Sequence, residues 1–154
     1  MTNRSILMTS ALMFLSSFGF LFHFSFHFAF AENTPPPVEI ETFKLNGAEM
    51  RFSHHGKLHL LVNADCLIEK NHLWEKNEKC QAIRKLKEVS LKKLGKALEG
   101  GANPGAVACL KVGGKSLIAV DSRSNQNSFC RFEDGSFVSS GTLHFYARQN
   151  DRLF

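Results

Sequence analysis

Several short motifs that identify enzymes and ligand-binding proteins are missing from this 154-residue sequence. The pair Gly113-Gly114 follows an expected helix instead of preceding one, so a phosphate-binding glycine loop is not predicted. The polar stretch 121–127 has neither the spacing nor the acidic content of a calcium loop. Glu133 and Asp134 are adjacent carboxylates, but they flank an expected tight turn, where Asp has a conformational role. We therefore predict no catalytic residue and no cofactor, and we expect that the chain is not an enzyme.

Charged residues are almost absent from the first 31 positions. Arg4 is the only charged side chain there, and residues 6–30 are almost wholly apolar. Ala29-Phe30-Ala31 fits a small-x-small cleavage site, which predicts a secretory signal peptide over residues 1–31. An uncleaved membrane anchor is the alternative, because the apolar run is longer than a usual signal core. Cleavage after Ala31 would export the chain to the periplasm or to the extracellular medium.

Cysteine is also scarce, and its positions limit the classes of function. The cysteines are Cys66, Cys80, Cys109 and Cys130. None lies near the expected cleavage site, which argues against a lipid anchor. An even number of cysteines in a small exported protein favours disulfides over metal or redox chemistry. Cys109 with His144 is a candidate catalytic pair, but Cys109 is expected on a buried helix face, where a reactive thiol is not predicted.

Two turn signals organise the first strands of the chain. Asn46-Gly47 predicts a tight hairpin in which Lys44 faces Glu49 across the pair. A second turn is expected near His55-Gly56. Apolar side chains lie on both faces of this meander, so the pattern does not say which face meets the core. The strands predicted around the two turns are 38–45, 48–54 and 57–62.

Residues 78–99 have the clearest helical pattern in the chain. Apolar side chains recur there at helical spacing, and Gly100-Gly101 would end the helix. The preceding stretch, 65–77, is expected to be an irregular or partly helical connection. A second, shorter helix is predicted over 104–112, because Asn103-Pro104 is a helix-start signal. Strands are then expected at 115–121 and 127–133.

The hairpin signal Asp134-Gly135 suggests how two of the cysteines meet. Under a two-residue turn at this position, Cys130 would share an apolar face with Phe132 and Phe137. Cys109 is expected on the buried face of the short helix, so a Cys109–Cys130 bridge would link that helix to the sheet. Four cysteines allow three pairings, and this geometry favours the one that also joins Cys66 to Cys80.

The expected fold is a single α+β domain. An antiparallel sheet would be covered by one long and one short helix, and disulfides would link these elements. The expected organisation of the chain is a signal peptide over 1–31, a proline-rich leader over 32–37 and the domain over 38–154.

Two segments carry a resemblance to a known family. NPGAVACLKVGGK and then NSFCRFEDGSFV resemble the small secreted bacterial domain of unknown function 333, whose members are often labelled hemolysins. The family pattern is N-P-A-S-x-x-C, then G-G, then a second Cys, then D-G-S. The matching residues are Asn103, Pro104, Cys109, Gly113, Gly114, Cys130, Asp134, Gly135 and Ser136.

The resemblance covers roughly residues 102–147. Family members commonly have a further Cys and a Trp soon after D-G-S, whereas this chain has Val138 and Gly141 nearby, so one family disulfide is expected to be missing. The resemblance implies no catalytic residues, and no feature of the sequence supports hemolytic activity.

The only dense histidine cluster is formed by His54, His55 and His59. In the expected hairpin, His54 and His59 would be diagonal neighbours on one face and could hold Zn²⁺ or Cu²⁺. No carboxylate or cysteine obviously converges on them, so a metal site is not predicted.

The last candidate site is a basic surface. Lys85, Lys92 and Lys96 would project from the long helix opposite its apolar stripe. An anionic lipid or polysaccharide of the cell envelope is a better partner for an exported protein than nucleic acid, and a merely solvated face is the alternative. We therefore rank a non-enzymatic envelope or extracellular interaction domain first. A small inhibitor of a hydrolase is second, and a metal binder using the histidine cluster is third.

Overall fold

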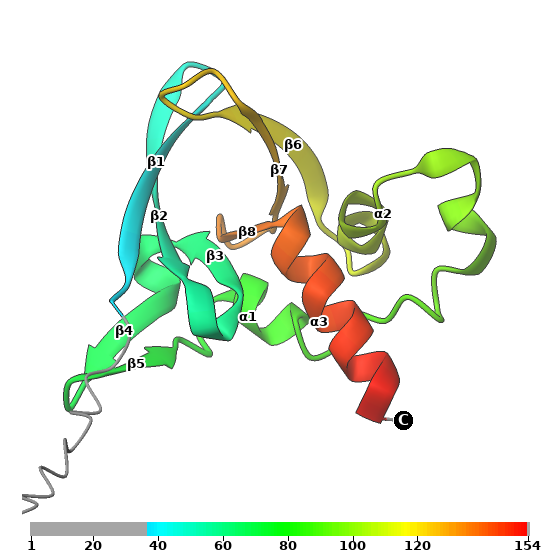
Figure 1. Ribbon diagram of the computed structural model, residues 1–154, viewed down its shortest axis with the longest axis horizontal. Helices are drawn as coiled ribbons and strands as arrows, with labels where there is room; N and C mark the ends of the chain where they lie inside the picture. Colours follow the sequence, from blue (N-terminus) through cyan, green and yellow to red (C-terminus); the bar gives the residue numbers. More distant parts are fainter. Residues whose placement is uncertain (1–36, 154) are drawn as a thin grey trace, which may run out of the picture. The chain divides into compact units, whose positions relative to one another are not determined.

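The computed structural model describes residues 37–153. The predicted signal peptide and all of the leader except Pro37 lie outside the described residues. All of the described residues belong to one compact unit. It combines antiparallel strands with several helices, which confirms the predicted α+β class (Figure 1). Within residues 37–153, no helix is both long and apolar enough to cross a membrane.

In the described part of the chain, six strands form a closed barrel in the order β1-β2-β3-β8-β7-β6. Two meanders that are each continuous in sequence make up this barrel. The first contains β1 (Glu39–Leu45), β2 (Ala48–His55) and β3 (Leu60–Asn63). The second contains β6 (Lys115–Val120), β7 (Gln126–Arg131) and β8 (Phe137–Ser139). Lys44 pairs with Val120 at one junction between the meanders, and Val62 pairs with Val138 at the other.

The hairpin predicted at Asn46-Gly47 is confirmed, and Lys44 lies opposite Glu49 in the expected register. Asn46 and Gly47 both have positive φ, at 50° and 84°, as a two-residue type I′ turn requires. The third strand begins at Leu60 and not at the predicted residue 57. Residues Gly56–Leu58 form a 3-10 turn, and His59 after it has a left-handed backbone with φ of 50°, so the extended conformation starts later.

The hairpin predicted at Asp134-Gly135 also forms, but its loop has three residues and not two. The backbone N–H of Phe132 donates to the carbonyl of Ser136, and Gly135 has φ of 81°. This geometry pairs Arg131 with Phe137. A one-residue change of register moves a side chain to the other face of a strand. The prediction that Phe137 shares a face with Cys130 is therefore wrong.

The barrel has apolar residues on both of its faces, which answers the question of which face meets the core. The inner cluster is entirely made of strand residues: Phe43, Leu45, Phe52, Ala119, Phe129 and Phe137. The rings of Phe52 and Phe129 lie 4.4 Å apart between centroids inside it. A second, larger cluster lies between the outer face of the sheet and the helices and includes Val62, Cys130 and Val138.

The predicted helix over 78–99 is wrong. Only α1 (Gln81–Lys85) is α-helical there, and Gly95–Gly101 is a 3-10 segment. Gly95 has φ of 49°, which a right-handed helix does not allow. The side-chain amide of Asn150 donates hydrogen bonds to the carbonyls of Leu86 and Val89, at 2.9 and 2.8 Å. These carbonyls are therefore bound by a distant element and not by a local helix.

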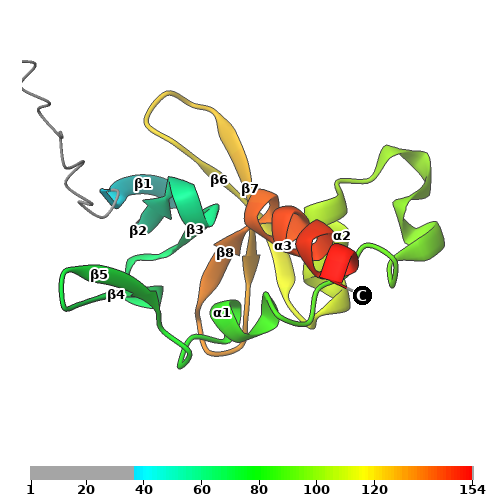
Figure 2. The ribbon, with the colours of Figure 1, turned by 60° about the horizontal axis from the view of Figure 1, so that its bottom comes forward.

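The stretch 65–77 is also more regular than predicted. It contains a second hairpin formed by β4 (Leu67–Lys70) and β5 (Leu73–Lys76), which pair antiparallel. This hairpin lies beside the barrel strands β1 to β3 (Figure 2). Cys66 precedes it and is bonded to Cys80, with a Cα–Cα distance of 5.7 Å. The disulfide thus joins the hairpin to the start of α1.

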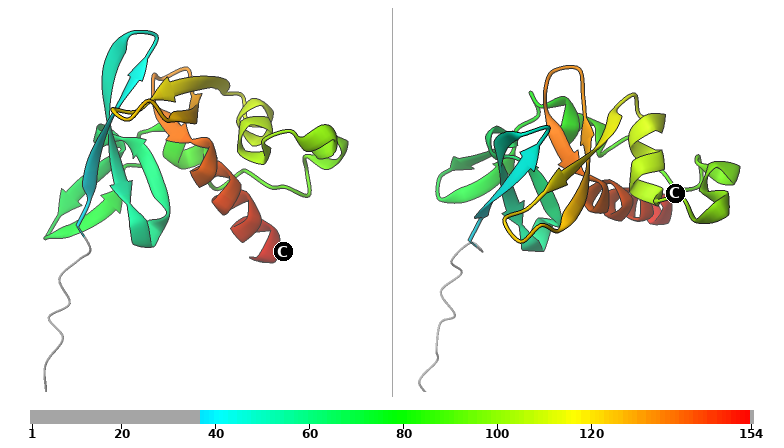
Figure 3. Two further views of the ribbon diagram at one scale, coloured as in Figure 1. Left: turned by 45° about the horizontal axis from the view of Figure 1, so that its top comes forward. Right: turned by 90° about the horizontal axis from the view of Figure 1, so that it is seen from above.

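Two helices cover the outer face of the second meander. α2 (Pro104–Lys111) matches the predicted short helix, and it packs against α3 (Ser140–Leu153) (Figure 3). Gly105 allows this close approach, because a Cβ atom there would overlap the backbone carbonyl of Ser140. α3 is the longest helix of the described residues, and no helix was predicted there from the sequence.

Candidate functional site

The residues that resemble the family pattern have structural roles, beginning with the short helix. The side chain of Asn103 accepts hydrogen bonds from the backbone N–H groups of Gly105 and Ala106, which caps α2. Cys109 is bonded to Cys130, with a Cα–Cα distance of 5.4 Å. This bridge links α2 to β7, and both cysteines are fully buried. No cysteine is free in the described residues, so Cys109 does not form a catalytic pair with His144.

Gly113 and Gly114, which follow α2, have different structural roles. Gly113 has φ of 85°, the left-handed conformation that ends a helix. Gly114 lies against the disulfide, and a Cβ atom there would overlap the sulfur of Cys130. The pair is therefore required by the backbone turn and by the bridge.

The Asp134-Gly135-Ser136 turn connects the second meander to α1. Ser136 Oγ accepts a hydrogen bond from the backbone N–H of Ala82 at 2.9 Å. Asp134 accepts hydrogen bonds from Ser136 and from the backbone of α1. Burial alone would raise the pKa of Asp134, but these hydrogen bonds outweigh burial and hold the pKa below its ordinary value.

The predicted histidine cluster does not form, because the 3-10 turn at Gly56–Leu58 separates its members. His54 pairs with Leu61 across the strands, and His59 lies outside β3 with a left-handed backbone, so the strand geometry behind the expected diagonal contact does not extend to His59. His55 is buried, and its Nδ1 accepts a hydrogen bond from the backbone N–H of Leu58. His59 stacks on Phe145 of α3, with ring centroids 3.9 Å apart.

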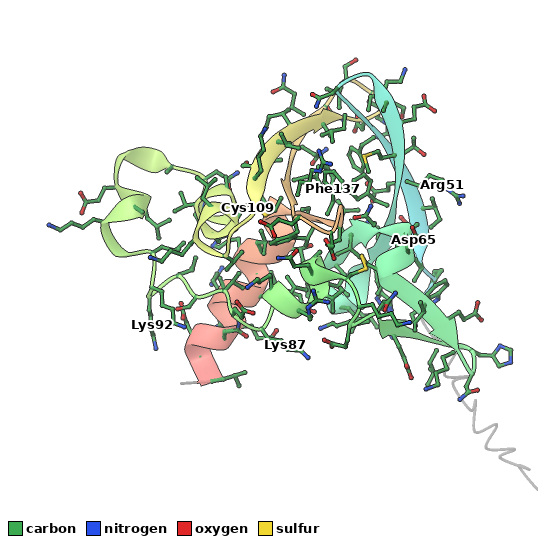
Figure 4. All side chains as sticks on the ribbon, turned by 180° about the vertical axis from the view of Figure 1, so that it is seen from behind. Arg51, Asp65, Lys87, Lys92, Cys109 and Phe137 are labelled. Carbon is green, nitrogen blue, oxygen red and sulfur yellow. A yellow bond between two sulfur atoms is a disulfide. The ribbon has the colours of Figure 1, made fainter. Side chains whose placement is uncertain are left out.

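The three lysines predicted to share a helix face lie on separate segments instead. Lys85 is in α1, and its Nζ lies 2.7 Å from a carboxylate oxygen of Glu88. Lys92 and Lys96 are exposed, and the backbone N–H of Lys92 donates to Asp151 of α3. Figure 4 shows Lys92 at the edge of the molecule beside α3. The helix face that motivated this set is absent, and an anion-binding role for it stays a prediction.

The structure reveals a different basic surface, along one face of α3. His144, Arg148 and Arg152 recur at every fourth position of the helix, so they lie in a row. With Gly141, Phe145 and Gln149 they line an open groove of about 350 Å³. We call these six residues the α3 groove. In the described part of the chain, neither arginine forms an ion pair with an acidic side chain.

Asp151 is the only acidic residue of α3, and it points away from the groove. Its carboxylate accepts hydrogen bonds from Ser90 Oγ at 2.5 Å and from the backbone N–H of Lys92 at 3.0 Å. These bonds hold the pKa of Asp151 below its ordinary value, with the Ser90 bond the largest cause. The arginine row therefore keeps its positive charge uncompensated by its own helix.

The spacing of His144, Arg148 and Arg152 was a signal available in the sequence. This spacing places the three side chains in a row only if residues 140–153 form a helix. That helix was not predicted from the sequence, in which Ser139 and Ser140 stand at its start. Ser139 Oγ in fact accepts from the backbone N–H of Thr142, which is the bond that an N-terminal cap makes.

Comparisons with known proteins support a family resemblance for part of the chain. No curated protein and no solved structure matches this chain significantly. Residues 100–144 match the family model described as "Domain of unknown function (DUF333)", which is the family that the N-P, G-G and D-G-S segments resemble.

Proposed function

We propose that the chain is a small, exported, non-enzymatic interaction domain that binds an anionic polysaccharide of the cell envelope through the α3 groove. The observation that carries the proposal is the row of His144, Arg148 and Arg152 in an open groove, where residues 37–153 provide no acidic partner. Guanidinium groups bind carboxylate, sulfate or phosphate groups with paired hydrogen bonds. The groove thus suits a ligand that carries such groups.

The geometry of the row favours a linear ligand. Residues four apart on a helix are separated by roughly 6 Å along its axis, so the row extends over roughly 12 Å. A polymer with regularly spaced anionic groups can meet all three side chains at once. Once Arg4 is removed with residues 1–31, the excess of 18 Lys and Arg over 14 Asp and Glu would also attract such a polymer from a distance.

Export is supported by the predicted signal peptide and by the two disulfides, which persist in oxidising compartments. Cleavage after Ala31 gives a mature chain that begins at Glu32. The intact mass of protein recovered from the periplasm or medium tests this step. A mass that retains residues 1–31 would establish the membrane-anchored alternative.

Binding is tested by retention of the mature protein on immobilised alginate, a polymer of anionic sugars. We expect retention at 10 mM salt that weakens at 150 mM, because the screening length falls from roughly 30 Å to roughly 8 Å. Arg148→Glu with Arg152→Glu should abolish retention. Both side chains are exposed, so the fold should be unchanged.

The matched control is Arg51→Glu with Arg123→Glu, which changes the net charge equally. Both residues are exposed in the barrel part of the molecule, and Arg51 lies on β2, away from Lys92 (Figure 4). Equal loss in both double variants would show that only net charge matters, and the α3 groove would not be the site. A third variant, Lys85, Lys92 and Lys96 to Glu, tests the surface predicted from sequence.

Vesicles of anionic phosphatidylglycerol serve as the second probe. Binding to vesicles without binding to alginate would replace the polysaccharide by a lipid headgroup. If the protein binds neither probe at low salt, the proposal fails, and the alternative of a hydrolase inhibitor moves ahead.

A further inference from the structure

A second group of polar side chains gathers on the first hairpin, far along the chain from α3. Glu39 of β1 lies directly opposite His54 of β2, and Glu41 is two residues further along the same face. One ligand atom from each of the three side chains lies within 4.8 Å of the other two. The closest pair is His54 Nδ1 and Glu41 Oε1, at 2.7 Å.

The position of this group follows from the alternation of side chains along a strand. Glu39 and Glu41 share a face of β1 with Phe43, which points into the barrel. His54 similarly shares a face of β2 with Phe52. The inward face of the hairpin therefore changes from aromatic to polar where the strands extend past the barrel interior. The three side chains point the same way because the strand pairing fixes them.

The charge of the group is not balanced by the protein. In residues 37–153, no lysine or arginine forms an ion pair with Glu39 or Glu41, although basic residues outnumber acidic ones in the whole chain. The imidazole of His54 is the one partner of Glu41. The side chains of His54 and Glu41 are half-buried, at 43% and 36% exposed, and Glu39 is exposed. Two carboxylates so placed suit a divalent cation.

We propose that Glu39, Glu41 and His54 bind one Zn²⁺ ion. Zinc accepts imidazole nitrogen and carboxylate oxygen as ligands, and three protein ligands leave one coordination position for water. Tetrahedral zinc places its ligand atoms roughly 3.3–3.6 Å apart, given metal–ligand distances of about 2.0–2.2 Å. Small rotations of the two glutamate side chains would bring the group to that spacing. The imidazole nitrogen favours zinc over magnesium or calcium, which prefer oxygen ligands.

The proposed zinc site differs in its residues from the histidine cluster in the sequence. His55 is buried and accepts a backbone hydrogen bond, and His59 is stacked on Phe145. Only His54 of the three contributes a ligand, and the carboxylates come from the partner strand. The site is also distinct from the α3 groove, so each proposal can fail without the other.

The test is calorimetric titration of the mature, metal-free protein with ZnCl₂. We expect one Zn²⁺ per chain and a rise in unfolding temperature with added zinc, because a ligand that binds only the folded state stabilises it. His54→Ala should weaken binding at least tenfold. The double variant Glu39→Gln with Glu41→Gln should do the same, since the amides keep the size of the side chains but lose their charge.

His72→Ala is the matched control. His72 lies on the β4–β5 loop with Nδ1 3.8 Å from Glu69, so it is another exposed histidine–glutamate pair, but it belongs to no group of three possible ligands in the described part of the chain. This variant should bind zinc like the wild type. Equal weakening by His72→Ala, or no zinc binding by the wild type, would overturn the proposal, as would equally tight binding of MgCl₂.

Nuclear magnetic resonance gives a readout that does not depend on a variant's folding. The imidazole signals of His54 should shift during the zinc titration, while those of His72 and His144 should not. A shift of other histidines without His54 would place any bound zinc elsewhere.

Discussion

Asp134 Oδ2 accepts a hydrogen bond from the backbone N–H of Gln81, 53 residues earlier in the chain, at 2.6 Å. Gln81 is the first residue of α1, and Cys80 before it makes no side-chain cap. The D-G-S turn therefore supplies from a distance the cap that α1 lacks locally. This contact joins the matched family segment to the part of the chain that precedes it.

Removing this cap should lower stability in a pH-dependent way. Asp134→Ala should cost about 1 kcal/mol at pH 7, a usual value for a helix cap. The pKa of Asp134 is lowered in the folded protein, so its stabilisation is present above the unfolded pKa, about 3.9, and is lost as pH falls through the folded pKa. Urea unfolding at pH 7 and at pH 2 should show a difference from wild type that shrinks in acid.

The exposed neighbour Glu133 provides the control for this experiment. Glu133→Ala removes a carboxylate from the same turn but no hydrogen bond in the described structure. Its unfolding curves should follow the wild type at both pH values. A constant deficit for Asp134→Ala from pH 7 to pH 2 would contradict the charged-cap explanation.

The contact between α2 and α3 depends on Gly105. Gly105→Ala should destabilise the protein by about 1–3 kcal/mol, because the new methyl group overlaps the backbone of Ser140 and the helices must separate. Gly56→Ala is the matched control, since its Cβ would meet no atom within 4 Å. Thermal unfolding of both variants checks the prediction. Equal effects would show that the two helices do not constrain residue 105.

The side-chain amide of the half-buried Asn150 should contribute to the stability of the fold. Asn150→Ala leaves the carbonyls of Leu86 and Val89 without their partner, and we expect a loss of about 1–2 kcal/mol in the free energy of unfolding. Gln149→Ala, at the adjacent exposed position, should change it by less than about 0.5 kcal/mol. Faster amide hydrogen exchange in residues 86–92 should accompany the first substitution only.

The disulfides predict a specific peptide map. Non-reducing digestion should release Cys66 with Cys80 and Cys109 with Cys130. Replacing both Cys109 and Cys130 by Ala should cost about 3 kcal/mol, because each bridge restricts the unfolded chain. A peptide that joins Cys66 to Cys109 would show a different pairing and would contradict the link between α2 and β7.

The sequence predicted the features that depend on short-range chemistry. Asn46-Gly47 set both the turn and the register of the first hairpin, and Asn103-Pro104 set the start of α2. It did not predict features that depend on distant partners. The stretch 78–99 has a helical pattern, but Asn150 binds the carbonyls of Leu86 and Val89 there, and Gly95 adopts a left-handed conformation.

The candidate sites were less predictable than the fold. The register that places Lys44 opposite Glu49 also places Glu39 opposite His54, so one carboxylate of the proposed zinc site could have been found. Because His54, His55 and His59 lie close together in the sequence, the other two histidines were the expected partners of His54. The α3 groove required the helix at 140–153, whose start at Ser140 follows β8 without a loop.

The segment that matches the family model contains only one of the two meanders of the barrel. Residues 100–144 contain β6, β7 and β8, which are three of the six barrel strands in the described residues. Each disulfide lies within one half of the molecule, so no covalent bond besides the main chain joins the halves. A polypeptide limited to the matched segment would have open edges on β6 and β8. Its β6 would lose the pairing with β1, and its β8 would lose the pairing with β3, so we expect that the segment folds only where other strands cover these two edges.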